Sequence, residues 1–195
     1  LSIRRQRQMC IRDRFMSMVG AERLTDAVQQ SNNTSEILSL LNNGIKASLK
    51  QSDNENTTRD GMDIALCSFN KEMSILEYSG ANRPLWIIRN ENKQEIIAIK
   101  ATKVAIGGLT PEDQIFENHK IDLNKGDSIY IFSDGYADQF SPSHKKLMTK
   151  KFKEILLSIQ DRSMEEQKKY LDSFIENWKG NLEQTDDVLV IGIQV

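Results

Sequence analysis

A run of short strand-like segments constrains the fold of this chain more than any other feature. The six segments are apolar, are separated by turns containing Gly or Asn, and follow one another without intervening helices; they span residues 62–69, 73–79, 84–89, 95–100, 115–123 and 127–132. Parallel strands need long crossover connections, usually helices, and none is indicated here. The pattern therefore predicts an antiparallel meander.

Helical patterns lie on both sides of these strands. Apolar residues recur at helical spacing over residues 15–28 and from Thr34 to Leu49, and two more helices are indicated over residues 145–160 and 164–179. A final strand is expected over residues 188–195. Helices, strands, helices and a strand, without regular βαβ alternation, predict an α+β domain in which helices cover the outer faces of sheets.

Composition excludes several classes of protein. The 195 residues carry 26 basic and 28 acidic side chains, and this balance gives no positive field for a nucleic acid. No apolar run approaches the roughly 20 residues of a spanning helix. Cys10 and Cys67 lie far apart, without the spacing of a zinc site or a disulfide framework. We expect one cytoplasmic domain that contacts neither nucleic acid nor membrane, although the intact protein could be anchored through a missing N-terminal region.

Residues 1–14 differ from the rest of the chain. They hold five of the ten arginines and none of the sixteen lysines, and with Asp13 they carry +4, which leaves −6 for residues 15–195. A basic arm for nucleic acid or a membrane surface is one interpretation. The other, which we favour, is a non-native or unstructured segment joined to a truncated sequence.

Two acidic corners adjoin apolar strands. Asp134 follows the strand over residues 127–132 and precedes Gly135, and Asp186 lies with Asp187 immediately before the final strand. Carboxylates at such positions suit a hard cation such as Mg²⁺ or Mn²⁺, and an ordinary turn or a solvated acidic pair is the alternative for each taken alone. If the two strands are neighbours in one sheet, the carboxylates converge where a cation would relieve their repulsion.

Other constellations are weaker. His119 and His144 are isolated, and the chain contains no GxSxG, GxxxxGK[ST] or GxGxxG motif. Zinc hydrolysis, serine hydrolase chemistry and nucleotide cradling are therefore unsupported. Arg83 lies on a tight turn between two expected strands and is either a ligand for an anionic group or a surface arginine.

Several ordered blocks resemble the bacterial SpoIIE-type, metal-dependent (PPM) serine/threonine phosphatases. The similarity spans residues 15–195 and is carried by FMSM (15–18), DGMDIAL (60–66), SGANRPL (79–85), IGG (106–108), FSDGYADQ (132–139) and TDDV (185–188). It implies an α-β-β-α sandwich, incomplete at the N-terminus. It also implies that Asp134 and Asp186 are catalytic metal ligands, with Asp187 in support and Asp60 near an additional metal, whereas no substrate-binding residue is indicated.

The resemblance implies a mechanism, and the sequence departs from the family pattern at two places. Two Mg²⁺ or Mn²⁺ ions held by carboxylates would activate a water that attacks phosphoserine or phosphothreonine. Leu189 stands where the family has a threonine in DDxT, and the family's DCTGHGxPGA-like block, which supplies a bridging aspartate, is replaced by the arginine-rich segment. We therefore expect weak or absent activity from this chain.

Partners and the rival function also follow from the resemblance. The expected substrate is a phosphorylated regulatory protein of the anti-sigma-antagonist type, controlled by a sensory domain upstream on the intact polypeptide. The rival is a catalytically silent, phosphatase-like binding module, and a plain interaction domain without metal is a third possibility. The presence of both Asp134 and Asp186 favours the enzyme, because a scaffold has no need for converging acids.

Overall fold

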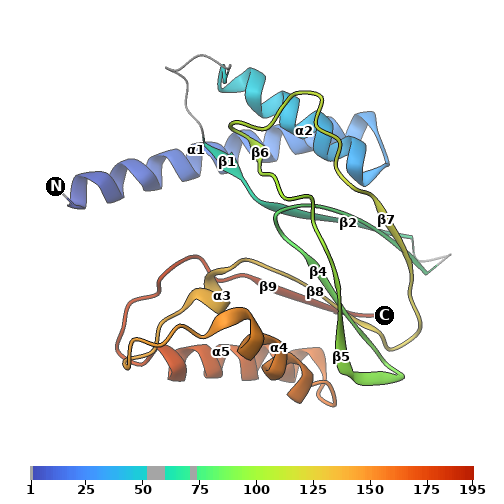
Figure 1. Ribbon diagram of the computed structural model, residues 1–195, viewed down its shortest axis with the longest axis vertical. Helices are drawn as coiled ribbons and strands as arrows, with labels where there is room; N and C mark the ends of the chain where they lie inside the picture. Colours follow the sequence, from blue (N-terminus) through green and yellow to red (C-terminus); the bar gives the residue numbers. More distant parts are fainter. Residues whose placement is uncertain (1, 52–59, 71–73) are drawn as a thin grey trace. The chain divides into compact units, whose positions relative to one another are not determined.

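The computed structural model describes residues 2–51, 60–70 and 74–195, with side chains from residue 14 onward. The chain divides into two compact units (Figure 1). The N-terminal unit comprises residues 1–82 and 101–121, and the C-terminal unit comprises residues 83–100 and 122–195. Residues 52–59 and 71–73 lie outside the described residues, and residue 73 is where a strand was expected to begin.

The N-terminal unit contains two helices and short sheets. Its elements are α1 (Ser2–Gln30), α2 (Thr34–Ser48), β1 (Gly61–Met62), β2 (Ile64–Asn70), β3 (Ile75–Ala81), β6 (Ile106–Gly107) and β7 (His119–Asp122). The sheets have the orders β1-β6 and β2-β3-β7. Asn33 caps α2 by accepting bonds from the backbone N–H groups of Ser35 and Glu36, and the apolar face of α2 packs beside Phe116 and Ala81.

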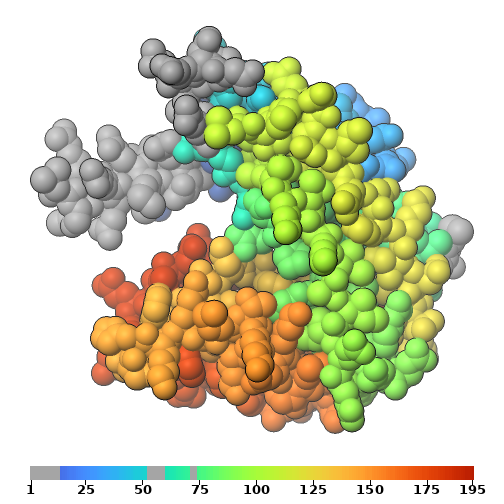
Figure 2. Space-filling view, viewed as in Figure 1, coloured from blue at the N-terminus to red at the C-terminus, as the bar shows by residue number. Residues whose placement is uncertain are grey.

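The segment after β6 covers α2. Asn42 and Lys46, on the buried face of α2, donate to the carbonyl groups of Pro111 and Thr110 at 2.9 and 2.8 Å, and Asn42 also accepts from the backbone N–H of Gly107. Figure 2 shows this yellow-green segment lying over α2. These bonds tie a long irregular connection to the helix and satisfy two of its carbonyl groups without a strand.

The C-terminal unit is a sheet with helices on one face. Its elements are β4 (Leu85–Arg89), β5 (Asn92–Ile99), β8 (Ser128–Phe132), α3 (Gly135–Asp138), α4 (Met148–Ser158), α5 (Met164–Lys179) and β9 (Val190–Gln194). The strands have the order β5-β4-β8-β9, with antiparallel neighbours throughout. The sheet and α4 and α5 enclose a core that includes Trp86, Tyr130 and Phe152 (Figure 1).

A capping box and an apolar stripe account for α5. Ser163 accepts a bond from the backbone N–H of Glu166, whose carboxylate accepts one from the backbone N–H of Ser163. Leu171 and Ile175 then reach the core from one face of the helix. The observed bounds of α5 match the helix expected over residues 164–179.

The single meander expected from the sequence is wrong in its connections. The expected strand over residues 115–123 contributes only β7, which pairs with β3, and β8 instead pairs with β4. The physical reason lies in β4, where Leu85, Trp86, Ile87 and Ile88 are all buried. A strand buried on both faces belongs inside a sheet, and β4 accordingly has β5 on one side and β8 on the other.

The structure also describes the backbone of the N-terminal segment and bears on whether a helix could span a membrane. The backbone from Ser2 onward belongs to α1, so residues 2–14 are helical, and their being foreign to the protein stays a prediction. Within the described ranges, no helix is both long and apolar enough to cross a membrane.

Candidate metal centre

Pairing of β8 with β9 brings the two acidic corners to the same end of one sheet. The strands are antiparallel, with Phe132 opposite Val190. Asp134 follows the end of β8, and Asp186 and Asp187 precede the start of β9. The two strands are therefore neighbours in one sheet, which is the arrangement under which the two aspartates were expected to converge.

Ser133 ties the two corners together. Its hydroxyl donates to the carbonyl of Asp187 at 2.7 Å and accepts from the backbone N–H of Leu189 at 2.9 Å. Its own N–H donates to the carbonyl of Leu189 at 3.0 Å. The hydroxyl and the backbone N–H thus extend the β8–β9 ladder past its last pair, up to the residue that precedes Asp134.

Gly135 allows the corners to approach closely. A Cβ atom at this position would fall on the carbonyl of Asp187 and would lie 3.1 Å from the carbonyl oxygen of Asp186. Both obstacles are backbone atoms, which cannot rotate away as a side chain can. The glycine after Asp134 is therefore required by the packing of the Asp186–Asp187 backbone against it.

The carboxylate of Asp134 is held by an arginine. Arg83 Nη2 lies 2.8 Å from Asp134 Oδ2, and the two side chains are 22% and 45% exposed. The Asp134 side chain forms no capping bond to α3, although it is the N-cap residue. Arg83 thus contacts an anionic group of the chain itself, and the sequence did not predict this partner because nothing in the turn identifies it. Binding of an anionic ligand by Arg83 stays a prediction.

Asp186 presents its carboxylate to solvent. It is exposed, and its Oδ1 accepts a bond from the backbone N–H of Asp187 at 2.7 Å. Within the described ranges, neither Asp134 Oδ1 nor Asp186 Oδ2 receives a hydrogen bond. Each of the two aspartates therefore retains one carboxylate oxygen for a ligand.

These donors fit a hard divalent cation, though sparsely. Mg²⁺ is commonly held by one or two carboxylates while it keeps several waters. The part of the chain that the structure describes contains no group of three or more His, Cys, Asp or Glu side chains placed to hold a metal. Asp134 and Asp186 thus fit as a partial metal site, and their assignment as ligands stays a prediction.

The remaining candidate residues lie elsewhere. Asp60 belongs to the N-terminal unit, where its carbonyl accepts a bond from Gln51 Nε2 at 2.8 Å. Its expected role near an additional metal stays a prediction. Leu189 contributes its backbone to the bonds with Ser133, and its side chain is exposed.

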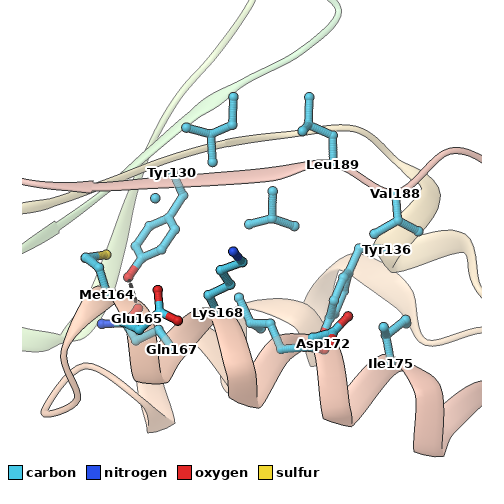
Figure 3. Close-up of a pocket in the computed structure, with 14 residues that line it drawn as sticks. Tyr130, Tyr136, Met164, Glu165, Gln167, Lys168, Asp172, Ile175, Val188 and Leu189 are labelled. Atoms are coloured by element: carbon cyan, nitrogen blue, oxygen red, sulfur yellow. Dashed lines mark hydrogen bonds between the residues drawn. The ribbon is translucent and has the colours of Figure 1, made fainter.

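A cavity lies behind the start of β9. It has a volume of about 560 Å³ and lies between β9 and α5. Figure 3 shows Lys168 rising from α5 toward the strand and Tyr130 reaching Gln167, to which its hydroxyl donates at 2.6 Å. Val188 and Leu189 line the cavity, but Asp134 and Asp186 do not. The acidic corner is therefore separate from this cavity.

Comparison with known proteins relates the whole described fold to phosphatase domains. A family model described as Stage II sporulation protein E (SpoIIE) matches residues 14–195. The SiaA-PP2C domain of Pseudomonas aeruginosa superposes with a TM-score of 0.80 at 20% identity, covering 93% of this chain and 69% of that one. A search of curated proteins gives no match.

Two further solved structures share the fold. One contains the PP2C phosphatase domain and a fragment of the regulatory domain of SpoIIE from Bacillus subtilis; its TM-score is 0.66 at 15% identity, covering 93% of this chain and 50% of that one. The other is RsbX in complex with magnesium, with a TM-score of 0.58 at 18% identity, covering 89% and 71% of the two chains. The expected α+β fold of phosphatase type is confirmed.

Proposed function

Because the chain belongs to the SpoIIE family and its own structural neighbours are PPM-type phosphatase domains, we propose that it is a metal-dependent protein serine/threonine phosphatase. The observation that carries this proposal is the convergence of the corners bearing Asp134 and Asp186 at one end of the β8–β9 pair. A structural role alone gives no reason to place two like charges at one corner.

The residues at this corner have two different roles, metal binding and control of the backbone spacing. Asp134 and Asp186 would hold Mg²⁺ or Mn²⁺ through their oxygens, and Ser133 and Gly135 fix the distance between the two backbones. When bound, such ions supply Lewis acidity and lower the pKa of the attacking water. No protein nucleophile is needed, in keeping with Cys67, whose pKa is raised to about 11 by burial and whose thiol is therefore a poor nucleophile at neutral pH.

The substrate side of the proposal rests on family resemblance. We propose a phosphoserine or phosphothreonine on a bacterial regulatory protein of the anti-sigma-antagonist type, with control by a sensory domain of the intact protein. Support comes from the family match over residues 14–195. The chain spans only half of the SpoIIE structure that includes part of a regulatory domain.

The proposal is tested by hydrolysis of a phosphoserine peptide with added Mn²⁺. We expect low, Mn²⁺-dependent turnover, because the described residues offer two aspartates and no larger ligand group. Asp134→Asn and Asp186→Asn should each abolish it. Asp161→Asn is the matched control, since Asp161 is an almost fully exposed aspartate of the same unit and forms an ion pair with Lys93. Hydrolysis that survives both site substitutions, or that needs no metal, would refute the assignment.

A catalytically silent binding module remains the second candidate. The observation that favours it is the Arg83–Asp134 ion pair, which neutralises one aspartate without any metal. Calorimetric titration with Mn²⁺ separates the two. Binding that disappears in Asp134→Asn supports the phosphatase, whereas no binding to the unsubstituted chain supports the silent module.

A further inference from the structure

Gln139 is a fully buried amide at the end of α3, five residues after Asp134. Its side chain is 0% exposed. Its Nε2 donates to the carbonyl of Glu183 at 3.2 Å, and its Oε1 accepts from the backbone N–H of Thr185 at 3.0 Å. Nε2 also donates to the carbonyl of Phe140 at 3.2 Å. The acceptor and one of the donor bonds of the side chain are thus directed at the segment that leads to Asp186.

The main chain of Gln139 is anchored independently of its side chain. Its carbonyl accepts from Trp178 Nε1 and from the backbone N–H of Leu147, both at 3.0 Å. Trp178 lies on α5 and Leu147 immediately precedes α4. Gln139 is therefore fixed to both helices of the unit, and its amide projects from this anchored position to the loop.

The loop that carries Asp186 has few other supports. Residues 183–187 are all exposed, so no buried apolar side chain among them holds the loop to the core. Gln139 forms hydrogen bonds with the loop before Asp186, and Ser133 donates a hydrogen bond to it after Asp186, at the carbonyl of Asp187. Ser133 immediately precedes Asp134 and Gln139 follows it by five residues, so the loop that carries Asp186 is held by side chains from the segment that carries Asp134.

We propose that Gln139 is a positioning residue that couples the two acidic corners, holding Asp186 at the distance from Asp134 that a divalent cation requires. This inference rests on the proposed metal site. Without a cation the two carboxylates repel each other, and the partly exposed pair of Arg83 with Asp134 weakens that repulsion without removing it. An exposed loop with few contacts would open under that repulsion, and buried hydrogen bonds on both sides of Asp186 oppose the opening.

The test compares two buried glutamines. Gln139→Met removes the side-chain bonds and keeps the volume and the main-chain contacts. Gln160→Met is the matched control, because Gln160 is also a buried amide of the C-terminal unit, and it donates to Tyr130 Oη and to the carbonyl of Leu156 rather than to the loop. We expect Gln139→Met to weaken Mn²⁺ binding in calorimetry by about tenfold, whereas Gln160→Met leaves it within about twofold.

A second measurement does not depend on the metal, and its first part does not depend on the folding of a variant. Hydrogen exchange of the unsubstituted chain should show the Thr185 amide protected, although it lies in an exposed loop. In Gln139→Met that amide should exchange about tenfold faster, with amides of β8 and α5 unchanged. Rapid exchange of Thr185 in the unsubstituted chain would overturn the inference.

The outcomes separate this inference from the proposed function. Equal Mn²⁺ affinity in Gln139→Met and the unsubstituted chain would refute the positioning role and leave the metal site standing. Weakening of similar size in both glutamine variants would also refute it, since the effect would then be a general loss of stability. No Mn²⁺ binding to the unsubstituted chain would overturn the metal site and the positioning role together, while Thr185 protection would still decide whether Gln139 holds the loop.

Discussion

Arg83 binds one of the two carboxylate oxygens of Asp134. The guanidinium and the carboxylate are 2.8 Å apart, and both side chains are partly exposed. A pair of this kind contributes about 0.2–1 kcal/mol, which is small beside the attraction of a carboxylate pair for a divalent ion. Arg83 therefore competes with a metal at Asp134 without excluding it.

Arg83→Met should strengthen the binding of Mn²⁺. Removal of the competing positive charge frees Asp134 Oδ2, and we expect the affinity to rise about two- to fivefold. Calorimetric titration at low ionic strength measures the change. Arg162→Met is the control, because Arg162 lies between α4 and α5 and its guanidinium lies over the ring of Tyr170 rather than against Asp134. Weaker binding in Arg83→Met would show that Arg83 supports the site.

Asp127 shows what a purely structural aspartate looks like in the same unit. It is fully buried and receives bonds from the backbone N–H groups of Asn90 and Asn124 and from Arg89 at 2.6 Å. Burial acts to raise the pKa of Asp127, but these bonds outweigh it and lower the pKa below the ordinary value. Every oxygen is occupied, unlike those of Asp134 and Asp186.

Substitution of Asp127 should cost stability rather than metal binding. Because the folded-state pKa is lower than the unfolded one, the stabilisation is complete above about pH 4 and is lost as the pH falls through the folded pKa. Asp127→Asn should lower the free energy of unfolding by about 2–4 kcal/mol at pH 7, and the difference should shrink below pH 4. Urea denaturation at pH 7 and pH 3 tests this, and an equal difference at both would contradict it.

At the residue scale, sequence reasoning found the acids and missed what holds them. Asp134 and Asp186 stand out because each adjoins an apolar strand. Arg83 and Gln139 act through partners 51 and 44–46 positions away, and no local pattern encodes such a contact. Their importance becomes visible only when the register of β8 and β9 is known.

The β8–β9 pair is the element that makes the acidic corner. The hydrogen bonds of Ser133 extend the strand pairing beyond its last residue pair, and α3 begins two residues later, at Gly135. A side chain at Gly135 would meet the carbonyl groups of both Asp186 and Asp187. The corner therefore depends on the absence of a Cβ atom as much as on the carboxylates.

Gly135→Ala should separate the two corners. The added methyl cannot be accommodated without movement of the Asp186–Asp187 backbone, and we expect a loss of about 1–3 kcal/mol together with weaker Mn²⁺ binding. Gly20→Ala is the control, because its Cβ would meet only the flexible end of Met62 and α1 would gain helix propensity. Thermal unfolding and calorimetry report both effects. An unchanged Mn²⁺ affinity in Gly135→Ala would contradict the role given to this glycine.

Elements with a strong local signal were predicted well, and their pairing was not. α2 and α5 have polar caps and apolar stripes, and both begin where these signals place them. α3 has only four residues, too few to show a period. The pairing of β4 with β8 joins segments about forty positions apart, so the order of the sheet required the structure.

At the scale of the whole molecule, the chain passes between its two units three times. It leaves the N-terminal unit after Asn82, returns at Ala101 and leaves again after Ile121. Asp134, Asp186, Arg83 and Gln139 all belong to the C-terminal unit, whereas Asp60 belongs to the other. The fold class could be inferred from the order of elements and from the ordered blocks of the resemblance, but this division could not, because neither unit is continuous in sequence.

Metal binding confined to the C-terminal unit should nevertheless stabilise the chain measurably. A ligand that binds only the folded state, present at a hundred times its Kd, adds about 2.7 kcal/mol to the free energy of unfolding. For a chain of this size that corresponds to a rise in Tm of roughly 5–10 °C. Mn²⁺ should therefore raise the Tm of the unsubstituted chain but not that of Asp134→Asn, whereas Asp60→Asn should respond as the unsubstituted chain does. A shift that is lost in Asp60→Asn would contradict binding by Asp134 and Asp186 alone, and a shift that persists in Asp134→Asn would place the cation away from the β8–β9 corner.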